Sequence, residues 1–278
     1  MINLKKLPII LTLLSFLTTF TSANAEIKVV ASIKPIHSLV SYLMDGIGKP
    51  DLIVDGYASP HGFAMKPSHA KMLQNADLIF WVGKDLENFL EKPLSSIAKK
   101  AEKIELIEIK GLQVLKFRER NIFDEHDHDH GHDDHGKKED DHDDHGHDDD
   151  HGKKEDDHDD HGHDDHDGHA HGEFDPHIWL DPINAKAMLN EMAEHLIEND
   201  PKNEAKYKSN LAKALQEIDK LTIDVMTDLS SSVASIVFHD AYQYFEKRFN
   251  VNILGAFTVN TDVMPGAEQL AEIREIIE

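Results

Sequence analysis

The sequence predicts an α/β protein: two lobes of parallel sheet, flanked by helices and joined by a long helix. Three observations support this fold class. Short apolar runs alternate with amphipathic stretches over the first hundred residues, one helical periodicity continues over 202–229, and a shorter series of strands and helices follows it. The predicted divisions are a signal peptide at 1–25, an N-terminal lobe at 26–182, linker helices at 183–232 and a C-terminal lobe at 233–278.

The first 25 residues have the pattern of a secretory signal peptide. Lys5 and Lys6 precede an uncharged apolar run at 7–20, and a small-residue cleavage site ends at Ala25. We expect cleavage after Ala25 and a mature chain in the periplasm. The sequence contains no cysteine, so it lacks the residue to which bacterial lipoproteins attach their lipid. This absence favours a protein that is free in the periplasm.

Strands and helices alternate through the N-terminal lobe. The continuous apolar run at 78–82 is typical of a strand buried on both faces. Gly46 is expected to end the first helix. Alternation of this kind predicts a parallel sheet with helices against it. The expected strands cover 27–32, 51–54, 78–82 and 104–109, and the expected helices cover 35–45, 68–75 and 85–99.

The segment 124–172 interrupts this pattern. It contains 22 acidic residues and four lysines, a net charge of −18, so the rest of the chain carries only −6 of the total −24. Fifteen of the 21 histidines lie here, and residues 135–149 recur without change at 151–165. The only apolar side chain is Ala170, so nothing offsets the roughly 1–2 kcal/mol per residue needed to order a backbone.

We therefore predict that the segment 124–172 is a disordered insertion when no metal is bound. Its histidines predict loose capture of several metal ions, and the alternative is a solvated acidic linker. The acidic balance of the whole chain argues against nucleic acid as a partner, because nucleic-acid binding needs a basic surface.

The second half of the chain is more helical. After a helix at 184–198, the helix predicted at 202–229 would be roughly 40 Å long, enough to bridge two lobes. Strands at 235–238 and 251–259 and helices at 241–249 and 265–278 make up the C-terminal lobe. The last helix has no stop signal, and the lobe is shorter than the about 50 residues of a small domain, so we expect it to be incomplete.

Three histidines outside the insertion share one context. His61 lies in a Ser-Pro-His-Gly loop shortly after a strand, His177 lies in an Asp-Pro-His-Ile-Trp segment, and His239 directly follows an apolar strand. In open α/β sheets, ligands gather at the carboxyl ends of strands. The other three, His37, His69 and His195, are expected to be ordinary structural residues, with His195 on a solvated helix face.

Several motifs, in this order along the chain, resemble those of one known family, the zinc-specific solute-binding proteins of high-affinity zinc uptake ABC transporters. The resemblance covers essentially the whole mature chain and includes an Asp/His-rich loop in the same place. The motifs are Ser59-Pro60-His61, Pro67-Ser68, Asn75-Ala76-Asp77-Leu78, Trp81-Val82-Gly83, His177-Ile178-Trp179-Leu180 and Phe238-His239-Asp240-Ala241-Tyr242.

The resemblance implies two lobes joined by a rigid backbone helix, with one Zn(II) ion in the cleft held by His61, His177 and His239. It also implies a monomer that delivers zinc to the membrane permease of an ABC transporter and has no enzymatic activity. Imidazole suits Zn²⁺, and three imidazoles leave a fourth position for water or a carboxylate. Asp240 is expected either to orient a histidine or to cap the following helix.

Three alternatives remain open at this stage. A manganese receptor of the same family and a stand-alone periplasmic zinc buffer would both bind metal in a similar way. A zinc hydrolase would need a general base beside the metal-bound water, and the sequence has no His-Glu-x-x-His pattern.

Overall fold

The computed structural model describes residues 26–118, 173–229, 234–258 and 265–277. The predicted signal peptide and the predicted insertion at 124–172 lie outside the described residues. Both sheets in the described part are parallel, and helices flank them, which confirms the predicted α/β class. Among the described helices, none combines the length and the apolar character needed to cross a bilayer.

The N-terminal sheet has four parallel strands in the order β2-β1-β3-β4. Val30 of β1 is paired with Asp51 on one side and with Ile79 on the other. Every residue of the two central strands, β1 and β3, is buried, as the continuous apolar run at 78–82 predicted. The strands are β1 (Val29–Ala31), β2 (Asp51–Leu52), β3 (Leu78–Trp81) and β4 (Glu102–Glu105).

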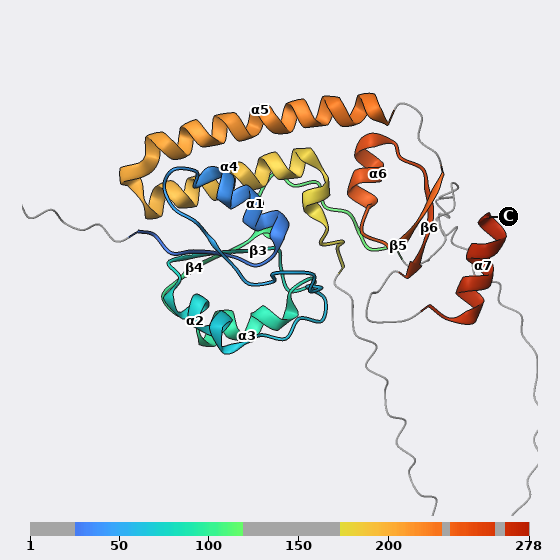
Figure 1. Cartoon of the computed structure of the whole chain (residues 1–278), viewed down its shortest axis with the longest axis horizontal. Helices are drawn as coiled ribbons and strands as arrows, with labels where there is room; N and C mark the ends of the chain where they lie inside the picture. The colour runs from blue at the N-terminus through green and yellow to red at the C-terminus, as the bar shows by residue number, and fades with distance from the viewer. Residues whose placement is uncertain (1–25, 119–172, 230–233, 259–264, 278) are drawn as a thin grey trace, which may run out of the picture.

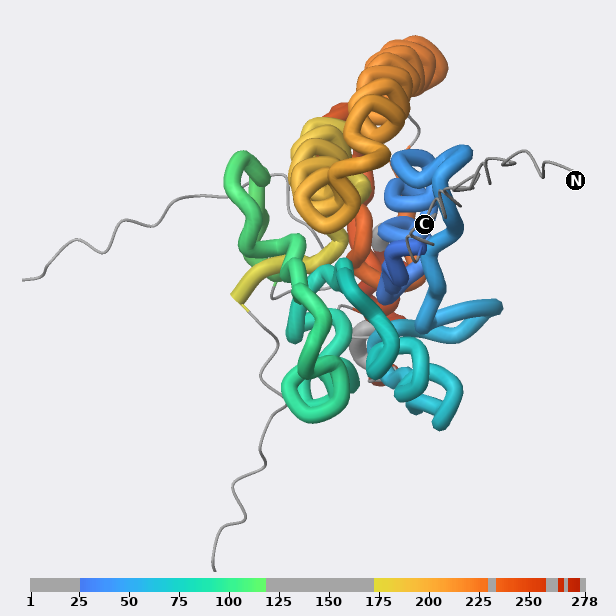
Figure 2. Tube along the Cα trace, turned by 90° about the vertical axis from the view of Figure 1, so that its left-hand side faces the viewer, coloured from blue at the N-terminus to red at the C-terminus, as the bar shows by residue number. Residues whose placement is uncertain are grey.

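Helices cover both faces of this sheet (Figures 1 and 2). The helices α1 and α4 lie on one face, and α2 and α3 lie on the other. One continuous apolar core joins the sheet to these helices, so the N-terminal lobe is a rigid support for the loops at its edge. The helices are α1 (Lys34–Leu43), α2 (Pro67–Asn75), α3 (Asn88–Ser96) and α4 (Pro182–Asn199).

Two elements in this lobe, one helix and one strand, differ most from the prediction. The helix α3 begins at Asn88 because the Glu87 carboxylate turns back and accepts hydrogen bonds from the backbone N–H groups of Val82 (2.9 Å) and Gly83 (3.0 Å). Burial raises the pKa of Glu87 to about 7. In the N-terminal sheet, the strand β4 ends at Glu105 and is followed by a 3₁₀ turn, η1 (Leu106–Glu108). The sequence predicted that this strand would continue to residue 109.

The predicted long helix is confirmed. A short 3₁₀ turn, η3 (Pro201–Asn203), leads into α5 (Glu204–Asp228), whose 25 residues span about 38 Å. Its first half packs on α1 and α4, and the Asn210 side chain donates hydrogen bonds to the carbonyls of Leu43 and Asp45. Figure 1 shows α5 extending from the N-terminal lobe to the C-terminal elements.

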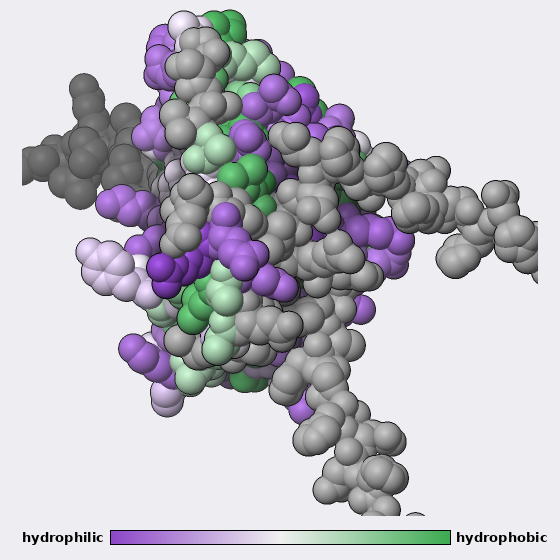
Figure 3. Space-filling view, turned by 90° about the vertical axis from the view of Figure 1, so that its right-hand side faces the viewer, coloured by the Kyte–Doolittle hydropathy of each residue, from purple (hydrophilic) through white to green (hydrophobic). Residues whose placement is uncertain are grey.

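The C-terminal elements form a smaller unit. The parallel strands β5 (Ser235–His239) and β6 (Ile253–Thr258) are connected by α6 (Gln243–Phe249), and α7 (Ala267–Ile277) packs against β6. No residue of β5 is fully buried, in contrast to β1 and β3. Apolar side chains reach this side of the molecule in small patches among hydrophilic ones (Figure 3).

Candidate metal centre

The structure brings His61, His177 and His239 together, although they are far apart in the chain. The ring centroids are 5.8 Å apart for His61 and His177, 5.9 Å for His61 and His239, and 5.4 Å for His177 and His239. One ring nitrogen from each lies within 4.8 Å of the other two. Three neutral imidazoles in this arrangement can coordinate one metal ion.

Each histidine occupies the end of a structural element. His61 lies in the loop that follows β2, and His239 is the last residue of β5, so both lie beyond the carboxyl ends of parallel strands. His177 precedes the 3₁₀ turn η2 (Ile178–Leu180), which leads into α4. The three histidines therefore come from both lobes, and only His177 is fully buried.

A buried carboxylate fixes the orientation of His177. Oδ1 of Asp175, which is fully buried, lies 2.7 Å from Nδ1 of His177 and also accepts a hydrogen bond from the His177 backbone N–H (2.9 Å). An ionised carboxylate can only accept, so a neutral imidazole in this contact has its proton on Nδ1 and its lone pair on Nε2. This is the arrangement by which carboxylates orient metal-binding histidines.

His239 has an unsatisfied nitrogen. Its Nε2 atom is buried and has no hydrogen-bond partner among the described residues. Buried polar atoms are nearly always paired, so an unpaired ring nitrogen on a histidine beside two other imidazoles fits a metal ligand. Burial, with a further contribution from the nearby His177, lowers the pKa of His239 and keeps its imidazole neutral, the form that binds metal.

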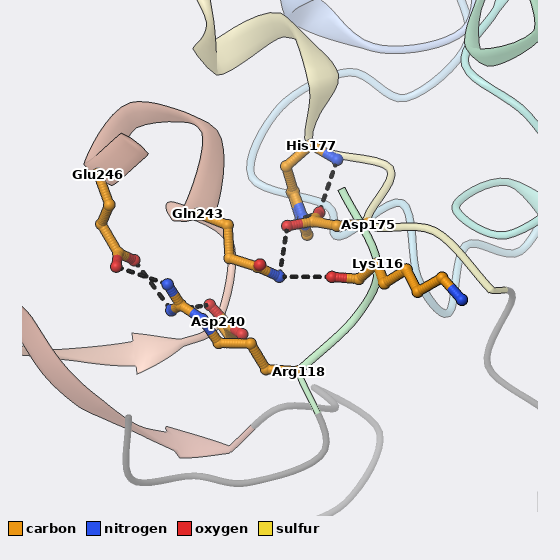
Figure 4. A network of polar contacts seen from close by, with 7 residues as sticks. All are labelled: Lys116, Arg118, Asp175, His177, Asp240, Gln243 and Glu246. Atoms are coloured by element: carbon orange, nitrogen blue, oxygen red, sulfur yellow. Dashed lines mark hydrogen bonds and ion pairs between the residues drawn. The ribbon is translucent and has the colours of Figure 1, made fainter. Parts of the chain in front are cut away.

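A polar network supports these two histidines (Figure 4). Gln243 of α6 donates from Nε2 to the second carboxylate oxygen of Asp175 and to the carbonyl of Lys116, both at 3.2 Å. Arg118 forms two hydrogen bonds with Glu246, at 2.6 and 3.0 Å, and one with Asp240 at 3.2 Å. The network ties residues on both sides of the segment 119–172 to the C-terminal elements.

The structure decides the open question about Asp240. Its carboxylate faces Arg118, and α6 begins at Gln243 without a side-chain cap, so Asp240 neither orients a ligand directly nor caps the helix. Burial raises the pKa of Asp240 to about 6, and the neighbouring guanidinium opposes this rise. Asp175 has the orienting role. The sequence feature that could have indicated this role is the position of Asp175 two residues before His177, in Asp-Pro-His.

The three histidines line a cavity of about 370 Å³ between the lobes. Its other walls are mostly apolar and include Ile33, Leu180 and Trp179, whose ring lies 5.4 Å from that of His177. The other tryptophan, Trp81, is buried in β3. An apolar wall around a few ligand atoms strengthens their electrostatic interaction with a cation.

The other three histidines lie outside this site. His37 contacts the carbonyl of Pro50 through Nε2 (3.1 Å), and Nδ1 of His69 accepts a hydrogen bond from the backbone N–H of Lys66 at the start of α2. The expectation for His195 was wrong. Its side chain is only 19% exposed and lies against Glu102 of β4. The periodicity of the helix that contains His195 gives no information about a neighbouring strand.

Solved structures share this architecture. A crystal structure of ZnuA matches with a TM-score of 0.65 at 19% identity, over 90% of this chain and 77% of that one. The periplasmic zinc-binding protein TroA from Treponema pallidum matches with a TM-score of 0.64 at 18% identity, over 91% of this chain and 74% of that one. The fold is therefore that of the two-lobed α/β solute-binding proteins.

Sequence comparison identifies the family. The family described as zinc-uptake complex component A, periplasmic (ZnuA), matches residues 29–278. The high-affinity zinc uptake system protein ZnuA of Brucella abortus (strain 2308) is 45% identical over 251 residues, which are 90% of this chain and 72% of that protein. The chain belongs to the ZnuA family.

Proposed function

We propose that this protein is a periplasmic receptor that captures Zn²⁺ with His61, His177 and His239 and delivers it to the permease of an ABC importer. In this proposal residues 1–25 direct export and are removed after Ala25. The segment 124–172 collects additional zinc loosely. The receptor acts as a monomer and has no enzymatic activity. The names of the family and of the Brucella relative, both of which refer to zinc uptake, support this assignment.

The single observation that carries the proposal is the spacing of the three imidazoles. On a tetrahedral zinc ion with Zn–N distances near 2.0–2.1 Å, ring centroids lie about 5.2 Å apart. The centroids in this protein are 5.4 to 5.9 Å apart, so a small inward movement is enough to complete the site. Imidazole ligands without a carboxylate favour Zn²⁺ over Mn²⁺.

The ligand geometry also provides a route for release. His61 belongs to the N-terminal lobe and His239 to the C-terminal elements, so separation of the two would break the coordination shell. A permease that binds the open form more tightly than the closed form would weaken zinc binding. The binding free energy lost would equal the difference in docking free energy between the open and closed forms. No covalent chemistry is required, and no proton donor or acceptor needs to act on a substrate.

Zinc titration of the full chain in competition with a chelator tests the proposal. We expect one tight site and several weaker ones. His177→Ala should abolish the tight site, and His37→Ala should retain it because His37 lies outside the cleft.

A variant lacking 124–172 should lose weak sites only. Lys116 and Phe174, which flank the segment 119–172, form an antiparallel bridge. Loss of the tight site in the deletion variant would refute the assignment.

Two further measurements separate the alternatives. Competition between Mn²⁺ and Zn²⁺ at equal concentration should leave zinc in the cleft, and retention of manganese would identify a manganese receptor. A strain lacking this gene should grow poorly when zinc is limiting. Normal growth of that strain would favour a zinc buffer that serves no transporter.

A further inference from the structure

A second group of metal-ligating side chains lies away from the cleft. Glu102, His195 and Glu198 each offer a ligand atom, and these atoms lie within 4.8 Å of one another. Glu102 is the first residue of β4, and the other two lie three residues apart in the last turns of α4. Residues three apart on a helix point to the same side, so strand and helix present their ligand atoms to one point.

The histidine of this group has a ring nitrogen suited to a cation. Nδ1 of His195 is buried and forms a short ion-pair contact, 2.8 Å, with Oε1 of Glu102. The opposite nitrogen, Nε2, lies 3.4 Å from a carboxylate oxygen of Glu191, one turn earlier. An ionised carboxylate only accepts, so the short contact is satisfied by a proton on Nδ1 in the metal-free protein. A cation bound at this point would take the place of that proton on Nδ1, and Nε2, beside Glu191, would carry the ring proton.

The glutamate from the strand is also held in place. Asn199 donates a hydrogen bond from Nδ2 to Oε2 of Glu102 (2.7 Å) and another to the carbonyl of His195 (2.9 Å). Oε1 of Glu102 is therefore the oxygen that faces His195. The arrangement parallels that in the cleft, where Asp175 holds Nδ1 of His177: a polar partner fixes the far side of each ligand.

We propose that Glu102, His195 and Glu198 form a second site for a divalent transition-metal cation such as Zn²⁺, with water completing the coordination shell. One imidazole and two carboxylates are suitable ligands for zinc. Glu198 is exposed, and the site has one imidazole where the cleft has three, so its affinity is lower than that of the cleft. The site lies near the opposite end of α4 from His177, and α4 is about 27 Å long.

Exchange of the imidazole C2 hydrogen with deuterium, measured for each peptide by mass spectrometry on the full chain, tests this site. Metal coordination slows this exchange, and the readout for His195 is separate from zinc held by 124–172. We expect His177 and His239 to slow at low buffered free Zn²⁺ and His195 to slow at higher free Zn²⁺. Glu198→Gln should raise the free Zn²⁺ needed for half-maximal slowing at His195 by about tenfold or more, while Glu194→Gln, on the same helix, should not.

The outcomes are distinct. If the exchange rate of His195 is the same with and without zinc, while His177 and His239 respond, His195 only forms ion pairs with its carboxylates and the second site does not exist. The same conclusion follows if Glu198→Gln and Glu194→Gln behave alike. Slowing at His195 without any response at His177 and His239 would instead contradict the proposed function of the cleft.

Discussion

The two walls of the cleft hold their ligands in different ways. The loop wall, residues 55–63, is mostly exposed, and the backbone N–H of His61 donates a long hydrogen bond (3.3 Å) to the Ser59 hydroxyl. The network wall consists of Asp175, His177, His239 and the polar residues of Figure 4. One wall therefore holds its histidines in a fixed orientation, and the other presents its histidine from a loop.

This difference determines which wall loses more conformational entropy when metal binds. A ligand that is already oriented loses little conformational freedom when metal binds, whereas a loop must be ordered at that moment. Conversely, a loop ligand can move away without breaking a buried network, which suits a receptor that must release its cargo. We expect the network wall to contribute most of the affinity and the loop wall to contribute most of the movement.

The largest expected effect separates the walls directly. His177→Ala should weaken zinc binding by more than about 100-fold, beyond the range for an outer partner of a ligand, because it removes a pre-oriented nitrogen. His61→Ala should cost less, because water can occupy the position of a loop ligand. Chelator competition measures both. Equal losses, or a larger loss for His61→Ala, would mean that the two walls do not differ in this way.

The next effect concerns Asp175 alone. Asp175→Asn keeps the size of the side chain but can donate to Nδ1 of His177, which favours the tautomer with its proton on Nε2. We expect zinc affinity to fall by about 10–100-fold. Asp219→Asn, an exposed substitution on α5, is the control and should leave affinity unchanged. Wild-type affinity in Asp175→Asn would show that the carboxylate does not set the tautomer.

Sequence reasoning predicted the parts of this molecule that depend on local pattern. The apolar run at 78–82 identified a buried strand, and the position of His239 directly after a strand identified a residue at the sheet edge. The same local reasoning placed His61 in a loop next to a strand end, and the structure brings both to one cavity.

The parts that sequence reasoning missed depend on long-range contacts. Arg118 and Glu246 are 128 residues apart in the chain, and neither of the two charged segments gives a sign of this pairing. His195 looked solvated because only its helical neighbours are visible in the sequence, while its partner Glu102 comes from a strand. The boundary of α3 was missed for a different, local reason, since the Glu87 side chain turns back to Val82 and replaces the expected first turn of the helix.

A smaller effect is expected from Arg118, which supports the network wall without touching a ligand. Arg118→Gln removes charged hydrogen bonds to Glu246 and Asp240, and we expect the free energy of unfolding to fall by about 2 kcal/mol. The pKa of Asp240 should rise further, because the guanidinium no longer opposes the effect of burial. Denaturant unfolding of the metal-free protein measures the loss of stability.

Lys116→Gln is the matched control for Arg118→Gln. Lys116 pairs with Glu173 at an exposed position, where an ion pair contributes about 0–1 kcal/mol. Zinc affinity should change less in Arg118→Gln than in Asp175→Asn, because no ligand loses its direct partner. If Arg118→Gln and Lys116→Gln have equal stability, the buried network does not stabilise this wall.

The finest test of the comparison uses two prolines, because one precedes a histidine on each wall. Pro60→Ala allows the free loop more conformations, which must be lost when His61 binds metal; we expect about 0.4–1 kcal/mol, or about a two- to fivefold weaker affinity. Pro176 is buried between Asp175 and His177, whose side chains already hold each other, so Pro176→Ala should change affinity less. Stopped-flow mixing with zinc should show a slower rate of binding for Pro60→Ala, while the rate of zinc release to a chelator should change little, since the bound loop is the same in both proteins. Equal losses for the two substitutions would mean that both histidines are equally ordered before the metal arrives.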